Sequence, residues 1–245
     1  MGNCIVKPSN KHASTGGGDT SGTTSSSSTV AVTENLKKFN YSELKKATRN
    51  FEANTRLGDG HFWSIFKGWV DSVTYSPSKV RVGVSIAVRK FNPDSHLDIT
   101  EWQALINFVA ILRHPNLVKL IGYCKEDDNF VLVYEYMLKG SLENHLFRKG
   151  VESLPWSTRI KIAIYAGHGL AFLHATKQDA FYLGFSASKF FLDGDFNAKL
   201  SNFGFTKLRI NLCDAQMMHT YAAPEYINTG ALRVTCDVYS FGVDC

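Results

Sequence analysis

Apolar residues alternate with polar ones along one stretch of the chain, and this pattern constrains the fold more than any other. Val80, Val82, Val84 and Ile86 occupy every second position. Side chains on a strand point alternately to its two faces, so this spacing predicts a strand with one buried face. We therefore expect a β-sheet in the region of residues 55–91.

A short helix is expected before this sheet. Leu44, Ala47 and Phe51 share one face at helical spacing, and Ser42 is the expected N-cap. After the sheet region, helices are expected over 100–112, 141–147 and 158–174. Strands are expected over 117–121 and 130–136. A sheet-rich lobe followed by a helical lobe is the arrangement that this order predicts, which is an α+β fold.

The longest expected helix carries a stripe of small and apolar residues. Ile160, Ile164, Gly167 and Ala171 recur at intervals of three or four residues. This spacing is typical of a helix, which is the structure predicted over 158–174.

Charge and cysteine content exclude several classes of function. The net charge is +5, of which residues 1–38 carry +2, and the rest is expected to be thinly spread. No run of basic residues suggests a nucleic-acid partner. The five cysteines are scattered without a C-x-x-C pair, so the sequence predicts no zinc site and no disulfide framework.

The first 38 residues predict a disordered tether that carries lipids. The stretch 14–29 is nearly all Ser, Thr and Gly, too polar to offset the entropy of ordering. Gly2 follows the initiator methionine and is the acceptor for N-myristoylation, although Val6 stands where Ser or Thr is usual. One acyl chain binds membranes only marginally, so palmitoylation of Cys4 is the expected second signal.

Several motifs occur in the order in which protein kinases carry them. In that order they are the glycine-rich loop (57–65), the strand of the kinase lysine (86–89), the segment after the first helix (114–123), the hinge (132–137), the Asp-Phe-Gly position (202–204), the Ala-Pro-Glu that closes the activation segment (223–225) and the start of the next core helix (237–242). The chain resembles a protein kinase over residues 39–245.

The residues within these motifs are similar to those of plant receptor-like cytoplasmic kinases. The resemblance implies a bilobal kinase-like fold, with residues 1–38 as the lipidated tail, 39–138 as the N-lobe and hinge, and 139–245 as an incomplete helical C-lobe. It also implies a location on the cytoplasmic face of the plasma membrane and a receptor kinase as partner. Because the C-lobe is incomplete, we expect low stability or dependence on that partner.

The resemblance assigns chemical roles to positions where this chain carries other residues. Six positions belong to the phosphoryl-transfer machinery: Arg89 for the strand lysine, Leu105 for the helix glutamate, Gly184 for the catalytic base, Ser186 for the loop lysine, and Lys189 and Asn202 for the two metal ligands. Glu101, one turn from Leu105, is an alternative partner for Arg89. Lys90 is expected to point to the other face of its strand.

The nucleotide pocket implied by the resemblance keeps its apolar residues. It comprises Leu57, Gly58, Gly60, Trp63, Ile65, Ala87 and Arg89, with Trp63 at the third glycine position. Phe191 stands where a smaller aliphatic residue touches adenine, and its ring either fills the cavity or turns into the core.

These replacements predict a membrane-tethered binding protein and not an enzyme. On this interpretation the chain is a scaffold, decoy or allosteric partner in receptor-kinase signalling. We expect its binding of ATP and Mg²⁺ to be lost or weak, and we expect no metal site. The alternatives are an unconventional serine/threonine kinase or nucleotide-binding switch, and a non-functional fragment.

Overall fold

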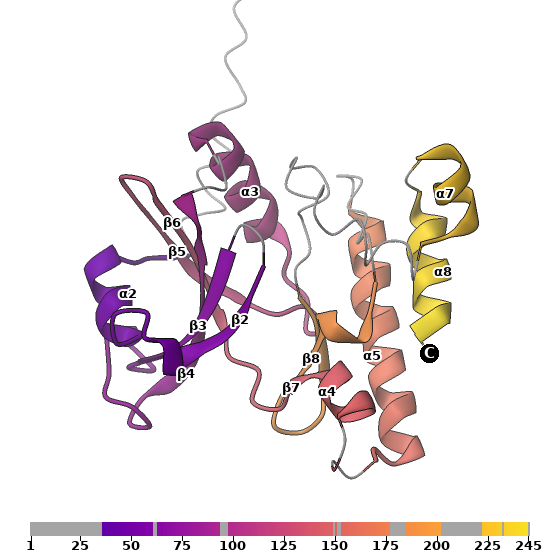
Figure 1. Ribbon diagram of the computed structural model, residues 1–245, viewed down its shortest axis with the longest axis horizontal. Helices are drawn as coiled ribbons and strands as arrows, with labels where there is room; N and C mark the ends of the chain where they lie inside the picture. The colour runs from indigo at the N-terminus through magenta and orange to yellow at the C-terminus, as the bar shows by residue number, and fades with distance from the viewer. Residues whose placement is uncertain are drawn as a thin grey trace, which may run out of the picture.

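The computed structural model describes residues 36–60, 63–93, 98–148, 150, 153–176, 185–201, 222–231 and 233–244. These residues form a sheet-rich lobe followed by a lobe built mainly of helices (Figure 1). The order of elements confirms the predicted α+β, kinase-like architecture.

The first lobe is organised around a six-stranded sheet. Its strands are β1 (Lys37–Lys38), β2 (Arg56–Asp59), β3 (Trp63–Val70), β4 (Val84–Phe91), β5 (Leu120–Glu126) and β6 (Asn129–Glu135). They lie in the spatial order β1-β5-β6-β4-β3-β2, and every neighbouring pair is antiparallel except β1 with β5. A 3-10 turn, η1 (Ala53–Thr55), leads into β2.

Helices cover the sheet and build the second lobe. They are α2 (Tyr41–Ala47), α3 (Ile99–Ile111), α4 (Leu142–Phe147), α5 (Trp156–Ala175), α7 (Pro224–Thr229) and α8 (Val234–Asp244). A small sheet of β7 (Gly140–Ser141), β8 (Phe190–Leu192) and β9 (Ala198–Leu200), with the 3-10 turn η3 (Ala187–Lys189), lies beside α5; β7 precedes that helix in sequence and β8 and β9 follow it (Figure 1). The helices predicted over 100–112, 141–147 and 158–174 are confirmed within two residues.

The alternating stretch that predicted the sheet is only partly a strand. β4 begins at Val84, and the chain before it forms a turn in which the Val82 N–H donates to the Lys79 carbonyl at 3.1 Å. Arg81 has φ 63°, which breaks an extended backbone, and Val82 is 75% exposed. The alternation at Val80 and Val82 therefore carries no strand, because a short apolar pattern cannot specify the backbone of a turn.

Two other predictions shift at element ends. Helix α2 begins at Tyr41 with Asn40 as N-cap, not Ser42, and the Glu43 carboxylate accepts the Asn40 N–H at 3.0 Å. The strand predicted over 117–121 begins at 120, because Leu117 instead bridges to Leu200 of β9.

The stripe that indicated helix α5 is not the side that the helix buries. Ile160, Ile164 and Ala171 are exposed, whereas the helix buries a neighbouring stripe: Ile162, Ala166, Gly169, Leu170 and Leu173. A helix with apolar residues on several sides offers more than one stripe at the same spacing. The choice is made by β9, because a Cβ at position 169 would overlap the Asn116 carbonyl and Leu200.

The two faces of the large sheet pack against different cores. On the face of the sheet that α2 covers, Val88 and Val133 are buried in a cluster with Leu44 and Cys124. Phe91 and Leu132 face the second lobe and share a cluster with α3, α5 and β8. The lobes are thus joined by a continuous core.

Among the described residues, no helix is long and apolar enough to cross a membrane.

Candidate functional site: the cleft between the lobes

The loop between β2 and β3 positions an indole beneath its own backbone. The Gly60 N–H donates to the Trp63 carbonyl at 2.8 Å, which closes the loop. A Cβ added at Gly60 would overlap the Trp63 ring, so indole and loop backbone are in direct contact. Gly58 faces open space, and Leu57 is exposed at the start of the loop.

Arg89 lies on β4 under this indole. Its guanidinium carbon is 4.2 Å from the Trp63 ring centroid and 5.5 Å from that of Phe91, and the residue is 3% exposed. Such stacking of a planar cation on aromatic faces is a favourable way to bury an arginine. The pairing of β3 with β4 sets Ile65 opposite Arg89, so the predicted pocket residues of these strands share one site.

Tyr134 is a member of this site that the sequence reasoning missed. Burial raises the pKa of Tyr134 to about 12, while the charge and hydrogen bond of Arg89 act to lower it. Tyr134 pairs with Ala87 across β6 and β4. The period-2 pattern of the hinge strand was the available signal, because Leu132 and Tyr134 share the face opposite to Val131 and Val133.

The outer face of β4 carries the neighbouring cation, as predicted. Lys90 lies over the rings of Tyr41 and Phe51, at 5.6 and 5.1 Å from their centroids. Lys90 therefore belongs to the α2 side of the sheet and not to the cleft.

Helix α3 brings an apolar residue to the position of the family glutamate. Leu105 is 1% exposed and packs in the core shared by the lobes. Glu101 lies at the helix N-terminus, where its N–H donates to Asp98 Oδ1 at 2.7 Å and its carboxylate accepts the Asp98 N–H at 3.4 Å. The alternative that placed Glu101 with Arg89 therefore does not describe this structure.

The remaining described site residues belong to the second lobe, on η3 and β8 and just before them. Ser186 is buried and its Oγ lies 2.8 Å from Ser188 Oγ, while the Lys189 carbonyl accepts both the N–H and the hydroxyl of Ser201, at 3.0 and 3.1 Å. Phe191 is half-buried on the face of β8 opposite to Phe190, which is buried in the core. Gly184, Asn202, Gly2 and Cys4 lie outside the described residues, so their predicted roles stay predictions.

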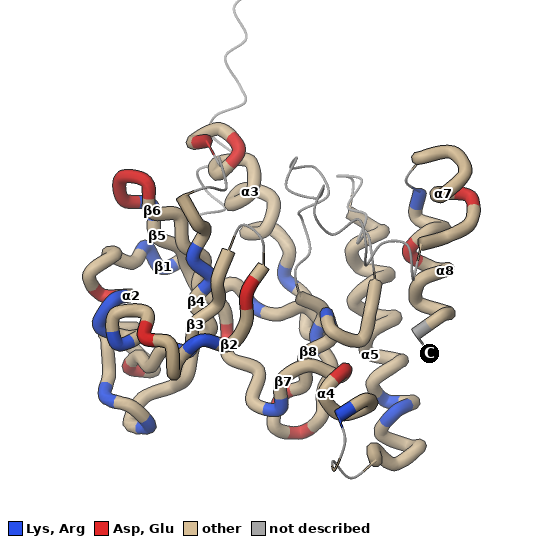
Figure 2. Tube along the Cα trace, viewed as in Figure 1, with Lys and Arg blue, Asp and Glu red and all other residues tan. Residues whose placement is uncertain are grey.

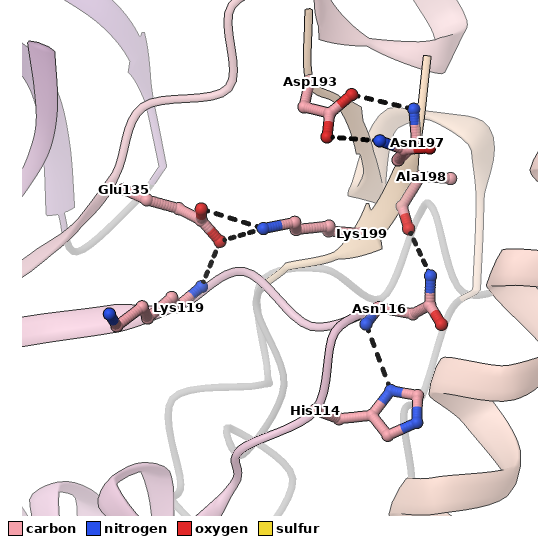
Figure 3. Close-up of polar contacts among 8 residues, drawn as sticks. All are labelled: His114, Asn116, Lys119, Glu135, Asp193, Asn197, Ala198 and Lys199. Carbon is pink, nitrogen blue, oxygen red and sulfur yellow. Dashed lines mark hydrogen bonds and ion pairs between the residues drawn. The ribbon is translucent and has the colours of Figure 1, made fainter. Parts of the chain in front are cut away.

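A polar network holds the hinge to the second lobe (Figure 3). Glu135 accepts Lys199 Nζ at 2.7 Å and the backbone N–H of Lys119 at 2.7 Å. Asn116 donates to the Ala198 carbonyl at 3.1 Å, and its own N–H lies 3.1 Å from His114 Nδ1. Segments more than 60 residues apart in sequence are thereby fixed to one another.

The cleft resembles a kinase nucleotide site, and comparison with known proteins decides the family. Residues 51–245 match the model described as protein tyrosine and serine/threonine kinase. The chain belongs to this protein kinase family. The predicted kinship with plant receptor-like cytoplasmic kinases is confirmed by its relatives.

Those relatives come from Arabidopsis thaliana. The probable serine/threonine-protein kinase PBL3 is 48% identical over 220 residues, covering 87% of this chain and 52% of that protein. The serine/threonine-protein kinase BIK1 is 46% identical over 236 residues, covering 89% and 60%. The chain thus spans little more than half the length of the relatives it matches.

This membership overturns two expectations from the sequence. The chain was expected not to be an enzyme and to use no ATP or Mg²⁺, whereas it belongs to a family of kinases that normally use both, and its relatives are named as kinases.

The described conformation nevertheless does not fit a triphosphate beneath the glycine-rich loop. Kinases cover the phosphates with this loop, and here the Trp63 indole contacts Gly60 on that side. Within the described ranges no group of three His, Cys, Asp or Glu residues is arranged to hold a metal ion. A nucleotide therefore requires Trp63 to turn away from Arg89.

Proposed function

We propose that this protein is a membrane-tethered signalling partner of receptor kinases whose interlobe cleft is a nucleotide-binding switch. Family membership supports a nucleotide site in the cleft. The relatives' names, serine/threonine-protein kinases, support a role in phosphorylation signalling. Gly2 and Cys4 support attachment to the plasma membrane through two acyl chains.

The observation that carries the switch is the stack of Trp63 on Arg89 against Gly60. Phosphates and indole compete for the same space, so the nucleotide binds only the conformation with Trp63 turned out. A ligand that binds one of two conformations shifts the population toward it. The nucleotide would thus change the shape of the loop and of the surface that it presents to a partner.

The test is ATP binding by wild type and by Trp63→Gly, which puts glycine at the third glycine position. Removing the competing ring removes the cost of selecting the open conformation, so the apparent affinity should rise about tenfold or more. Stabilisation by ATP with Mg²⁺, read as a shift in Tm, measures this. Trp69→Phe, at the other end of β3, is the matched control and should bind ATP like wild type.

The same titration gives a second readout of the switch. Tryptophan fluorescence of the wild type should change as ATP binds, and the change should be absent from Trp63→Gly and present in Trp69→Phe. Equal ATP affinity in wild type and Trp63→Gly, or no Tm shift in either protein, would contradict the proposed nucleotide-binding switch.

An unconventional serine/threonine kinase is the second candidate, and Arg89 is the observation that favours it. The residue keeps a permanent positive charge in the cleft at the position of the phosphate-clamping lysine. Labelled phosphate transferred to a general protein substrate by wild type, and lost in Arg89→Met, would establish this candidate. Transfer that survives in Arg89→Met would point to a contaminating kinase.

Membrane attachment has its own test. Gly2→Ala removes the acceptor for myristate and should move the protein from the membrane to the soluble fraction of plant cells. Cys4→Ser should give partial release, because one acyl chain alone binds reversibly. Unchanged membrane association of Gly2→Ala would contradict the lipid anchor.

A further inference from the structure

The charge of the protein is concentrated at the start of its folded part. The described residues of 36–93 contain 11 Lys and Arg against 4 Asp and Glu, a net +7, whereas the described residues from 98 onward contain 10 against 12, a net −2. The expected thin and even spread of charge is therefore wrong. Figure 2 shows the basic residues over α2 and its surroundings, at the end of the molecule farthest from α7 and α8.

Helix α2 turns its basic side away from the sheet. Leu44 and Ala47 are buried against the sheet, which leaves Lys45, Lys46 and Arg49 exposed. The helix packs on the face of the sheet opposite to the cleft, because its cluster contains Val88 and Val133 and not the cleft residues. These cations therefore point outward from the back of the first lobe.

The loop between β3 and β4 extends this surface. Lys79 and Arg81 are exposed on it, and Tyr75 of the loop packs edge-on against Phe39, with ring centroids 6.4 Å apart. Phe39 lies two residues before α2, so the loop adjoins the start of the helix. Two apolar side chains project from the loop, Val73 at 82% and Val82 at 75% exposure.

The acidic residues in this region are engaged locally. Glu43 caps α2 through the Asn40 N–H, and Glu52 lies 3.8 Å from Arg49. Asp71 accepts the N–H groups of Val73 and Thr74, at 3.0 and 2.8 Å, and these bonds lower the pKa of its carboxyl. Glu126 also lies close enough to Cys124, under α2, to help raise the pKa of that thiol. These four carboxylates reduce the charge of the surface but leave it positive.

We propose that this surface docks directly on an anionic lipid bilayer. We call it the outer basic face and define it by Lys38, Lys45, Lys46, Arg49, Lys79 and Arg81. Each Lys or Arg near an anionic leaflet changes binding by about fivefold. Val73 and Val82 enter the interfacial region of the bilayer, where exposed apolar side chains leave water. A nucleic acid would use the cations but leave both valines exposed, so the combination favours a membrane.

The docking deepens the proposed membrane attachment by choosing an orientation. Because the outer basic face lies on the back of the sheet, the cleft points away from the bilayer and stays open to nucleotide and partner. The residues between Gly2 and Leu36 span at most about 120 Å when extended, which permits the lipid anchor and the face to engage together. Acyl chains and face would then act as linked sites that strengthen each other.

The test uses the full chain made without acyl chains, so that the outcome does not depend on lipidation. Sedimentation with vesicles of phosphatidylcholine alone, or with about 30% phosphatidylserine, measures binding. Wild type should bind only the anionic vesicles, and about 0.5 M salt should release it. The charge-reversal variant Lys45→Glu/Lys46→Glu/Lys79→Glu/Arg81→Glu should lose at least about 100-fold in affinity.

Two further variants make the result specific. Val73→Ser/Val82→Ser keeps every charge and should weaken vesicle binding several-fold with an unchanged Tm. Arg148→Glu/Arg233→Glu reverses exposed charges of the second lobe and should bind like wild type. The proposal is overturned by equal binding to neutral vesicles, by no binding to either kind, or by binding that the face variants do not weaken. In plant cells, Gly2→Ala is therefore also made in the charge-reversal variant, and retention of that protein on membranes would contradict the lipid anchor and not this face.

Discussion

Single residues in the first lobe owe their chemistry to burial. Arg89 is sealed between aromatic rings and Tyr134, and Cys124 lies at 0% exposure under α2. Between α3 and β5, His114 is partly buried against the ring of Phe172 of α5, with the two ring centroids 4.8 Å apart. Two of these groups, Cys124 and His114, lead to predictions about single side chains.

Cys124 should be chemically inert while the protein is folded. Desolvation, assisted by the charge of Glu126, raises the pKa of Cys124 to about 12. The thiolate is the reactive form, and near pH 8 it is then roughly one part in 10⁴ of the thiol. Peptide mass spectrometry after iodoacetamide treatment should find Cys124 unmodified in the native protein and modified in urea. Rapid modification of the native protein would contradict this environment.

His114 should make stability fall in mildly acidic solution. Desolvation, followed by the charge of His168, lowers the pKa of His114 from its usual value. The unfolded chain then binds more protons, so the free energy of unfolding decreases as pH falls through about 6.5. Urea unfolding near neutrality and near pH 5 should show a smaller decrease for His114→Asn than for wild type. Identical decreases would mean that His114 does not titrate as described.

Helix α3 begins with a capping box formed by Asp98 and Glu101. Asp98 Oδ1 accepts the Glu101 N–H at 2.7 Å, which satisfies one of the free donors of the first turn, and the helix then carries Trp102 and Leu105 into the core.

Removing this cap should destabilise the protein without altering the cleft. Asp98→Ala should cost about 1 kcal/mol in the free energy of unfolding, whereas Asp98→Asn keeps an acceptor and should cost a few tenths. Chemical denaturation measures both, and Gln103→Ala on the exposed side of the same helix is the control. An equal loss for Ala and Asn would show that the side-chain acceptor is unimportant.

At the scale of the whole molecule, the lobes are coupled at the hinge. Glu135 lies at the end of β6 and its partner Lys199 on β9, with exposures of 27% and 19%. Since the pair is partly shielded and also holds the Lys119 N–H, it should contribute more than an exposed ion pair does.

A double-mutant cycle should detect this coupling. Glu135→Gln and Lys199→Met should show an interaction of about 1 kcal/mol in the free energy of unfolding. The exposed pair Arg49–Glu52 is the matched control and should show an interaction near zero. Additive effects at Glu135 and Lys199 would mean that the contact does not stabilise the joint between the lobes.

The cleft and the outer basic face occupy opposite sides of one sheet. Alternation along β4 sends Arg89 to the cleft and Lys90 to the α2 side, so neighbouring residues serve different surfaces. A nucleotide switch in the cleft and a membrane contact on the back would therefore operate without competing for space.

Much of this protein follows from the sequence alone. Motif order gives the family and the two lobes, and helical periodicity gives α3, α4 and α5, because both are properties of contiguous residues. The sequence also shows that Arg89, Leu105 and Lys189 replace the usual kinase residues. Strand geometry predicts that Lys90 points to the face of β4 opposite to Arg89.

Only the tertiary structure decides what those residues touch. The turn at Val80 and Val82, the buried stripe of α5, the contact of Tyr134 with Arg89 and the gathering of basic residues around α2 all depend on segments that are distant in sequence. The sequence does not specify the direction of the Trp63 indole, which is set by its contacts with Arg89, Gly60 and the core. Local patterns specify backbone and face, whereas side-chain contacts and surface charge are set by packing between elements.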